Sequence, residues 1–170
     1  KGYPQFSAPD EFLYAIRDAG FDVLLTANNH CLDRGQKGLE RTITKLDSLG
    51  IPYAGTYQNN QIKNVRYPLI LEKKGIRIAL LNYTYGTNGF KTTGSNVVNY
   101  IDKTAISRDI ELARAQKVDV IIACMHWGEE YKQIPSSAQK EMAMWLIKQG
   151  VNHVIGSHPH VVQPIVVQTD

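Results

Sequence analysis

Cysteine, clusters of basic residues and long apolar runs are all scarce in this 170-residue sequence, and each absence excludes a class of protein. Only two cysteines occur, Cys31 and Cys124, and they form no C-x-x-C pair, so the sequence predicts buried thiols rather than a disulfide framework. Lysine and arginine number 19 against 16 aspartate and glutamate residues, a net charge of +3, and no arginine-rich arm stands out. No nucleic-acid partner is therefore expected.

Membrane-spanning and secretory segments are also missing from these residues. No apolar stretch approaches the ~20 residues of a membrane span, and the opening residues, KGYPQFSAPD, lack the apolar centre of a signal peptide. A length of 170 residues suffices for a sizeable core without disulfide bonds. We therefore expect residues 1–170 to belong to a single domain, with any signal or membrane anchor lying outside them.

Apolar periodicity predicts helices that alternate with strands. The expected helices are one opened by a capping pair at Ser7 and Asp10 and ended by Gly20, one over 36–49, one marked by Ile106, Ile110 and Ala113, and one capped by Ser136 with Gln139 that ends at Gly150. The expected strands are 22–26, a short one near Tyr53, a hairpin of 67–72 and 76–83, and 118–125, 152–155 and 161–168. This alternation predicts right-handed βαβ units, and residues 85–99 are expected to form a long loop over the site.

Three of the expected strands end in amide or imidazole side chains. The strand ends carry Asn28, Asn29 and His30, then His126, then His158 and His160. Because ligands of open α/β sheets bind outside the carboxyl ends of the strands, these side chains are expected to meet at one edge, with Asn28 at the rim. His153 begins its strand at the opposite edge and is assigned no role.

These residue types favour a metal site, although each motif also has a purely structural explanation. Neutral imidazole is the commonest protein ligand of transition metals, and an amide oxygen can share such a site. Alternatively, Asn29 and His30 form a turn, and His126 is a hydrogen-bonded core residue. The pair His158 and His160 favours the metal more strongly, because the proline between them stiffens the backbone while both imidazoles project toward a common point.

Residues beside these motifs give further candidates with open alternatives. Asp33 either orients His30 through a ring N–H or adds a favourable charge at a helix amino terminus. One of Glu129 and Glu130 would reach the site, while the other is expected to stay in solvent. Trp127 is interpreted as a packed residue at the rim of the site rather than a platform for substrate.

Four stretches resemble the bacterial capsule synthesis family known as CapA or PgsA, which is associated with poly-γ-glutamate capsules. They read ANNHCLDRG (27–35), GIPYAGT (50–56), MHWGEEY (125–131) and GSHPHVVQP (156–164). The domain of that family is similar to the calcineurin-like metallophosphoesterases. The resemblance covers nearly the whole chain and implies an α/β fold, a metallophosphoesterase-like layered sandwich of a mixed, mostly parallel sheet with flanking helices.

The same resemblance implies roles for individual residues. In metallophosphoesterases two divalent metal ions (Mn, Fe, Zn or Mg) share a bridging hydroxide that attacks phosphorus. By this likeness Asn29, His126 and His158 would hold one ion, and His160 would reach toward the other. The catalytic pair would be His30, as an acid or a stabiliser of the transition state, with Asp33 in support.

Two parts of the family pattern are absent. They are the amino-terminal strands, which carry an aspartate in a GD motif and an acidic residue on the next strand, and a strand reading SLGNF beyond the final histidines. The chain is therefore expected to be an internal fragment, incomplete at both ends, whose exposed strand edges favour a homodimer. Without those carboxylates, we expect it to bind at most one metal ion, weakly, and to lack an enzymatic rate of phosphoester hydrolysis.

The leading hypothesis is a capsule biosynthesis domain of the CapA type with a metallophosphoesterase-like metal site. The alternatives are a metal-dependent phosphodiesterase or phosphatase unrelated to capsules, and a non-catalytic surface component that binds or guides the polymer. The expected partners are an anionic polymer or phosphoester substrate and a membrane complex for capsule synthesis. The expected location is the cell envelope, outside the cytoplasm.

Overall fold

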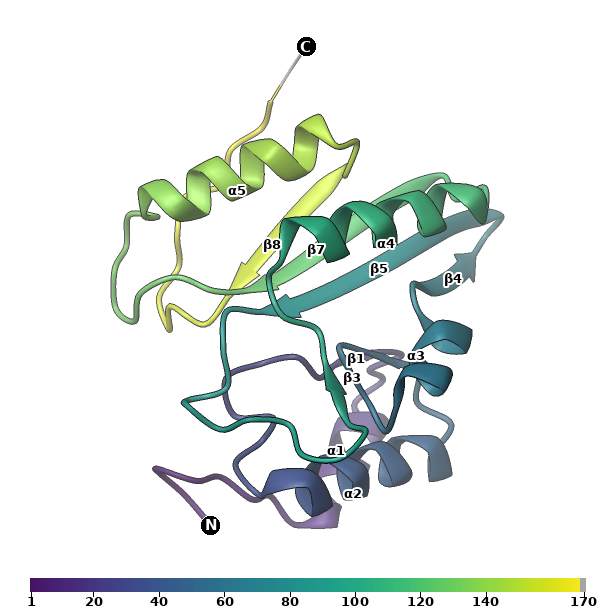
Figure 1. Cartoon of the computed structure of the whole chain (residues 1–170), viewed down its shortest axis with the longest axis vertical. Helices are drawn as coiled ribbons and strands as arrows, with labels where there is room; N and C mark the ends of the chain where they lie inside the picture. Colours follow the sequence, from purple (N-terminus) through teal and green to yellow (C-terminus); the bar gives the residue numbers. More distant parts are fainter. Residues whose placement is uncertain (169–170) are drawn as a thin grey trace.

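The centre of the structure is a four-stranded sheet whose two middle strands are the most buried (Figure 1). The computed structural model describes residues 1–168, and the strand order is β4 (Leu69–Lys73), β5 (Ile76–Thr84), β7 (Val120–His126) and β8 (His153–Ser157). β5, β7 and β8 are parallel, and β4 pairs antiparallel with β5. Ala123 and Cys124 project to opposite faces of β7 and are both buried, because the sheet is covered on both sides.

Two helices cover one face of this sheet (Figure 1). α4 (Lys103–Ala115) connects β5 to β7, and α5 (Ser137–Lys148) connects β7 to β8. Both connections step in the same direction across the sheet, so right-handed crossovers bring both helices to the same face. Side chains cap both helices: Asp102 Oδ1 accepts a hydrogen bond from Ala105 N (2.8 Å), and Ser136 forms the predicted capping box with Gln139.

Short strand pairs and three further helices lie on the other side of the sheet (Figure 1). Their bounds are α1 (Asp10–Asp18), β1 (Leu24–Leu25), α2 (Gly35–Ser48), β2 (Tyr53–Ala54), β3 (Thr56–Tyr57), α3 (Asn60–Arg66) and β6 (Val97–Val98). β1 pairs parallel with β2, and β3 pairs antiparallel with β6. No helix in the described part of the chain has the length and apolar character needed to cross a membrane.

One buried asparagine joins the short strands to the central sheet. Asn82 on β5 is 3% exposed; its Oδ1 accepts from Ala27 N (2.8 Å), and its Nδ2 donates to Cys124 O (3.1 Å). Ala27 follows β1 and Cys124 lies on β7, so this side chain fixes the end of β1 against the sheet. Gly55 permits the approach, because its φ is +121° and a Cβ there would overlap Asn82 Oδ1 and Ala27 N.

The expected fold class is confirmed: the structure is mixed α/β with a mixed sheet and flanking helices. The predicted hairpin of β4 and β5 turns at Lys74 and Gly75, both at positive φ. The strand predicted over 22–26 is reduced to β1. Three elements were not predicted, namely β3, α3 and β6, and the last lies inside the stretch 85–99 that was expected to be loop.

The strand predicted over residues 161–168 is wrong. These residues have no strand pairing in the described part of the chain, and Ile165 is 92% exposed. Pro164 has no N–H to give to a ladder, and the side chain of Gln163 is instead hydrogen bonded to Lys132 O (2.8 Å) and Gln139 Nε2 (3.1 Å). Apolar composition alone therefore does not make this segment a strand.

The capping pair predicted at Ser7 and Asp10 is also wrong. The residue before α1 is Pro9, and no side chain caps the helix there. Asp10 instead pairs with Arg41 (2.7 Å) and Lys45 (2.9 Å) of α2, and these two cations lower the pKa of its carboxyl group. Asp10 therefore ties α1 to α2 rather than starting α1.

Candidate metal centre

The carboxyl ends of β1 and β7 bring an amide and an imidazole into contact. His126 Nε2 lies 2.8 Å from Asn29 Oδ1, and the side chain of Asn29 is buried. On the other side of the ring, His126 Nδ1 lies 3.1 Å from Ser157 Oγ at the end of β8. Three strands thus position one imidazole.

Two further histidines follow β8 and lie beside His126. The ring centroids of His126 and His158 are 4.9 Å apart, and those of His158 and His160 are 5.8 Å apart. Tyr85 directly follows β5, and its ring centroid lies 4.9 Å from that of His158. The Tyr85 ring is nearly parallel to the His126 ring, with 6.4 Å between the centroids. The structure therefore gathers these imidazoles at the carboxyl edge of the sheet, where the order of strands predicted them.

The backbone of the loop after β8 is unusual. His158 and His160 both have left-handed backbone angles, with φ of +96° and +59°. Such angles are uncommon for residues with a Cβ and are concentrated at sites where function requires a particular side-chain direction. Pro159 between them is buried and anchors the loop.

His30 and Asp33 form a hydrogen-bonded pair next to these histidines. His30 Nδ1 lies 2.8 Å from Asp33 Oδ2, and the carboxylate is buried. The same oxygen accepts a hydrogen bond from Phe6 N (2.8 Å), and the Phe6 ring packs edge-on against His30 at 4.6 Å. Since Nδ1–H donates its hydrogen bond to the carboxylate, the other ring nitrogen of His30 is left free.

Burial keeps the central imidazoles neutral. The pKa of His126 is lowered to about 4, chiefly by burial and then by repulsion from His158, His30 and His160. Burial also lowers the pKa of His158. At neutral pH both rings therefore carry the lone pair that a metal ligand requires.

The contacts of His126 fit the metal that the family resemblance implies. Ligand atoms bonded at ~2.0–2.2 Å to one ion lie roughly 3–3.5 Å from each other, close to the separation of His126 Nε2 and Asn29 Oδ1. With Nε2 on a metal, the ring proton sits on Nδ1 and is donated to Ser157 Oγ, the type of outer contact that orients metal-bound histidines. The residues present thus fit a divalent transition metal.

Three further residues singled out from the sequence have other surroundings. Trp127 is packed, as interpreted from the sequence: its side chain is 8% exposed and lies in the hydrophobic core against Gly156, because it projects away from the face that carries His126. Asn28 is a turn residue whose Oδ1 accepts from His30 N (2.9 Å). His153 starts β8 and therefore lies at the end of the strand away from Ser157.

Three residues of this region were not predicted from the sequence: Tyr85, Asn88 and Ser157. Asn88 Oδ1 accepts a hydrogen bond from Asn29 Nδ2 (3.2 Å), so the 85–99 stretch does contact the candidate centre. Tyr85 and Ser157 follow or end parallel strands, as the histidines do. A search of the strand ends for tyrosine and serine, as well as for histidine and asparagine, would have found Tyr85 and Ser157.

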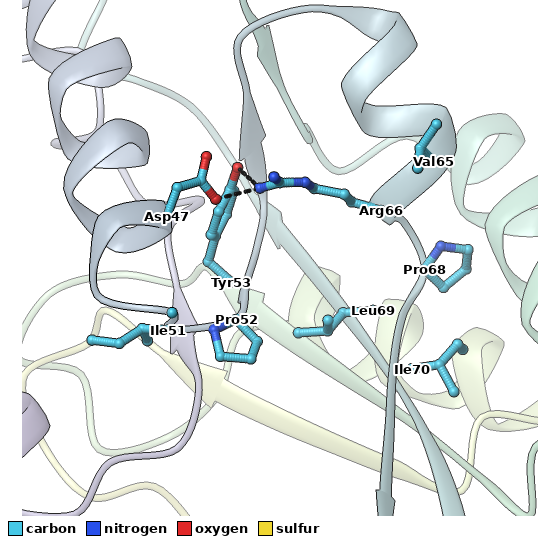
Figure 2. A pocket seen from close by; sticks show the side chains of 10 residues that line it. Asp47, Ile51, Pro52, Tyr53, Val65, Arg66, Pro68, Leu69 and Ile70 are labelled. Carbon is cyan, nitrogen blue, oxygen red and sulfur yellow. Dashed lines mark hydrogen bonds and ion pairs between the residues drawn. The ribbon is translucent and has the colours of Figure 1, made fainter.

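A cavity that no histidine lines lies between α2, α3 and the amino end of β2 (Figure 2). It has a volume of about 450 Å³ and opens beside the amino end of β2. Arg66 bonds Asp47 and the Tyr53 hydroxyl (2.8 Å) there, as Figure 2 shows, so its charge is already paired. Apolar side chains line most of the remainder: Ile51, Pro52, Val65, Pro68, Leu69 and Ile70.

Comparison with known proteins shows the family of this chain. The model of the family described as bacterial capsule synthesis protein PGA_cap matches residues 1–170, and the chain belongs to that family. It is 32% identical over 163 residues to the capsule biosynthesis protein CapA of Bacillus anthracis, and 28% identical over 160 residues to the PGA biosynthesis protein CapA of Bacillus subtilis (strain 168). These alignments cover 92% of this chain but 39% and 41% of the two relatives, so the chain spans about two fifths of their length.

Proposed function

We propose that this domain carries a metal-dependent phosphoester hydrolase site that serves poly-γ-glutamate capsule biosynthesis. The observation that carries the proposal is the convergence of Asn29, His126 and His158 on one side of the sheet edge, next to the pair of His30 and Asp33. Neutral nitrogen and amide ligands beside a separate imidazole acid are the parts that metal-assisted phosphoryl chemistry needs.

The metal would be held by Asn29 Oδ1, His126 Nε2 and His158, with His160 beside them. A bound divalent ion would supply an acidified water molecule and neutralise charge on a phosphoryl oxygen. The chain's own residues hold the ligands in place: Ser157 orients the His126 ring, and Asn88 fixes the amide of Asn29 so that Oδ1 faces that ring.

His30 would transfer a proton to the leaving group. The Asp33 carboxylate accepts the hydrogen bond from Nδ1 and would stabilise the imidazolium form of His30, whose second proton, on Nε2, would pass to the leaving group. The contact of Phe6 with both residues of the pair limits rotation of the ring and partly excludes water from it. Asp33 is in this proposal a positioning residue.

The link to the capsule rests on the family and on the names of the relatives. The relatives are named for capsule and PGA biosynthesis, and this chain would perform a step of the same process at the cell envelope. An anionic polymer or a phosphoester is the expected substrate, and a membrane complex for capsule synthesis is the expected partner.

Metal content tests the site directly. The purified chain is loaded with Mn²⁺ or Zn²⁺, dialysed and analysed for metals. We expect at most one ion per chain, lost in His158→Ala and retained in His153→Ala, the control at the other end of β8. Equal metal content in both variants would refute the proposal.

Catalysis is tested in a longer protein. Residues 1–170 replace the matched segment of the Bacillus subtilis relative, and hydrolysis of bis(p-nitrophenyl) phosphate and polymer yield are measured. His30→Ala should reduce both, whereas His153→Ala should reduce neither. Polymer yield that survives His30→Ala but fails in His158→Ala would favour a non-catalytic component that binds or guides the polymer.

A further inference from the structure

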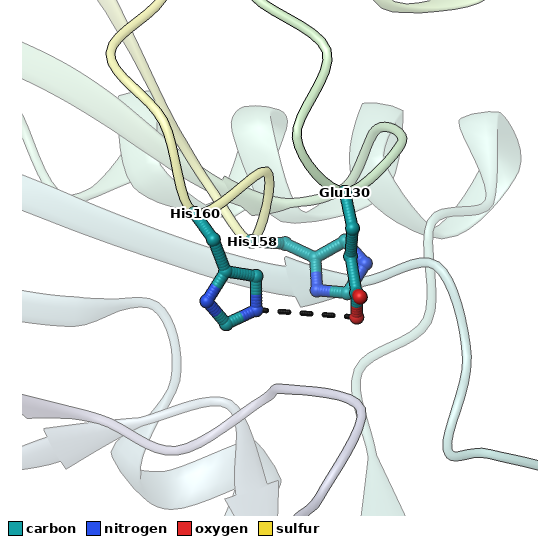
Figure 3. A group of neighbouring side chains, drawn as sticks. All are labelled: Glu130, His158 and His160. Atoms are coloured by element: carbon teal, nitrogen blue, oxygen red, sulfur yellow. Dashed lines mark ion pairs between the residues drawn. The ribbon is translucent and has the colours of Figure 1, made fainter.

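The loop after β7 brings a carboxylate to the two histidines that follow β8 (Figure 3). Glu130, His158 and His160 each offer one ligand atom, and these three atoms all lie within 4.8 Å of one another. From this geometry we infer that Glu130 is a metal ligand and completes, with His158 and His160, a binding position for a divalent transition metal. The inference rests on the proposed function, because it supplies a carboxylate for the same sheet edge.

Small side-chain rotations suffice to close this group around an ion. Glu130 Oε1 lies 3.9 Å from His160 Nε2, and the two side chains face each other across the gap in Figure 3. Ligand atoms on one ion bonded at ~2.0–2.2 Å are roughly 3–3.5 Å apart, so a contraction of less than about 2 Å is required. Glu130 and His160 are both exposed, so their side chains have room to rotate toward a common ion.

Backbone hydrogen bonds hold the two loops together on either side of the group. Trp127 N donates to Ser157 O (3.1 Å), and Tyr131 N donates to Pro159 O (2.7 Å). Gly128, at φ +94°, starts the turn between these bonds, and a Cβ there would lie 2.7 Å from Gln139 Nε2. Glu130 is thus fixed next to the histidines by the path of the chain.

The chemistry of the group matches a cation rather than a structural ion pair. Two imidazoles and one carboxylate are the protein ligands of many zinc and non-haem iron sites. His158 Nδ1 is buried and has no hydrogen-bond partner among residues 1–168, as expected of a ring that lacks one of its binding partners. The left-handed backbone at His158 and His160 directs both imidazoles to the same side as Glu130.

The neighbouring glutamate provides an internal comparison. Glu129 is exposed and does not belong to the group of metal-ligating side chains found in the described residues, although it differs from Glu130 by one position. Of the two carboxylates weighed from the sequence, the geometry selects Glu130. The pair therefore supplies a control that changes the net charge equally.

The test is a titration of the purified chain with Zn²⁺ and with Co²⁺, followed by calorimetry and by the visible spectrum of cobalt. We expect Glu130→Gln to weaken Zn²⁺ binding at least about tenfold and to change the Co²⁺ spectrum, because a charged ligand is lost. Glu129→Gln should bind as the unchanged chain does. Glu130→Asp, which keeps a shorter carboxylate, should bind with intermediate affinity, and circular dichroism checks the fold of each variant.

Three results would overturn the inference, and they differ in what they say of the proposed function. If His158→Ala abolishes binding while Glu130→Gln and Glu129→Gln bind equally, Glu130 is not a ligand, but the metal site of the proposed function stands. If the unchanged chain binds neither ion at millimolar concentration, or if His158→Ala leaves binding intact, both fail. If Glu130→Gln loses metal binding while His126→Ala retains it, the ion lies at Glu130, His158 and His160.

Discussion

The two halves of the candidate metal centre are built in different ways. Asn29 and His126 are held by strand ends, and a network of buried hydrogen bonds fixes the layers that carry them. Glu130 and His160 are exposed on loops, which backbone hydrogen bonds and the left-handed φ angle of His160 hold in position. The first half is therefore coupled to the stability of the whole fold, whereas the second can be changed with little effect on folding.

The largest effect on the buried half is expected at Gly55. Gly55→Ala places a Cβ against Asn82 Oδ1 and Ala27 N, so we expect a loss of roughly 3 kcal/mol or more in the free energy of unfolding, measured with urea. Gly20→Ala is the control, since Gly20 also has a positive φ (+87°) but open space around it. Equal losses in both variants would show that overlap with Asn82 is unimportant.

A smaller loss is expected from the buried asparagine itself. Asn82→Ala leaves Ala27 N and Cys124 O without their partners, which should cost roughly 1–3 kcal/mol in the free energy of unfolding. Asn64→Ala, on an exposed position of α3, should be nearly neutral. If the Zn²⁺ affinity of Asn82→Ala is unchanged, the attachment of β1 to the sheet does not determine the positions of the metal ligands. The proposed difference between the two halves is then wrong.

Acid should weaken the buried half before it affects the rest. The pKa of His126 is about 4 in the folded chain, below the usual value of 6.5, so between these values the unfolded chain binds a proton that the folded chain does not. The contribution of His126 to the free energy of unfolding of the metal-free chain should therefore be fully present above pH 6.5. It should be lost as the pH falls toward 4. Urea denaturation at several pH values across this range should show that the free energy of unfolding depends less steeply on pH in His126→Asn than in the unchanged chain. An identical dependence on pH would contradict the assignment of the effect to His126.

The smallest effect is expected at Ser157, which is exposed and whose hydroxyl is hydrogen bonded to the outer nitrogen of His126. Ser157→Ala should leave the unfolding free energy nearly unchanged but reduce Zn²⁺ affinity roughly tenfold if the ion uses His126. Ser157→Thr keeps the hydroxyl and should restore binding. An ion held by Glu130, His158 and His160 would be insensitive to both substitutions.

Much of the fold could be predicted because its main elements are specified locally. The hairpin of β4 and β5 and the capping box at Ser136 follow from residues adjacent in the chain. β6 could not be predicted in this way, because its two residues are held by pairing with β3 and by the bond from Asn99 N to Gly55 O (2.8 Å). Such short strands depend on distant partners rather than on their own composition.

The candidate site divides along the same line. The meeting of His126 with His158 follows from strand order, since adjacent parallel strands end at one edge. The choice of Glu130 over Glu129 depends instead on the turn at Gly128 and on the positive φ of Tyr131 (+63°), which sequence periodicity does not report. Side chains on loops were therefore the part that the sequence left open.

The backbone angle of His158 also bears on how this domain would respond to selection or redesign. At φ +96° the backbone conformation costs less free energy for a glycine than for a histidine. His158→Gly should therefore remove strain from the metal-free chain while it deletes a proposed ligand. Selection for stability alone would discard this histidine, and only selection for what it binds would keep it. Under the proposed metal binding, stability and binding therefore oppose each other at position 158, and a stabilised version of the domain should keep this histidine.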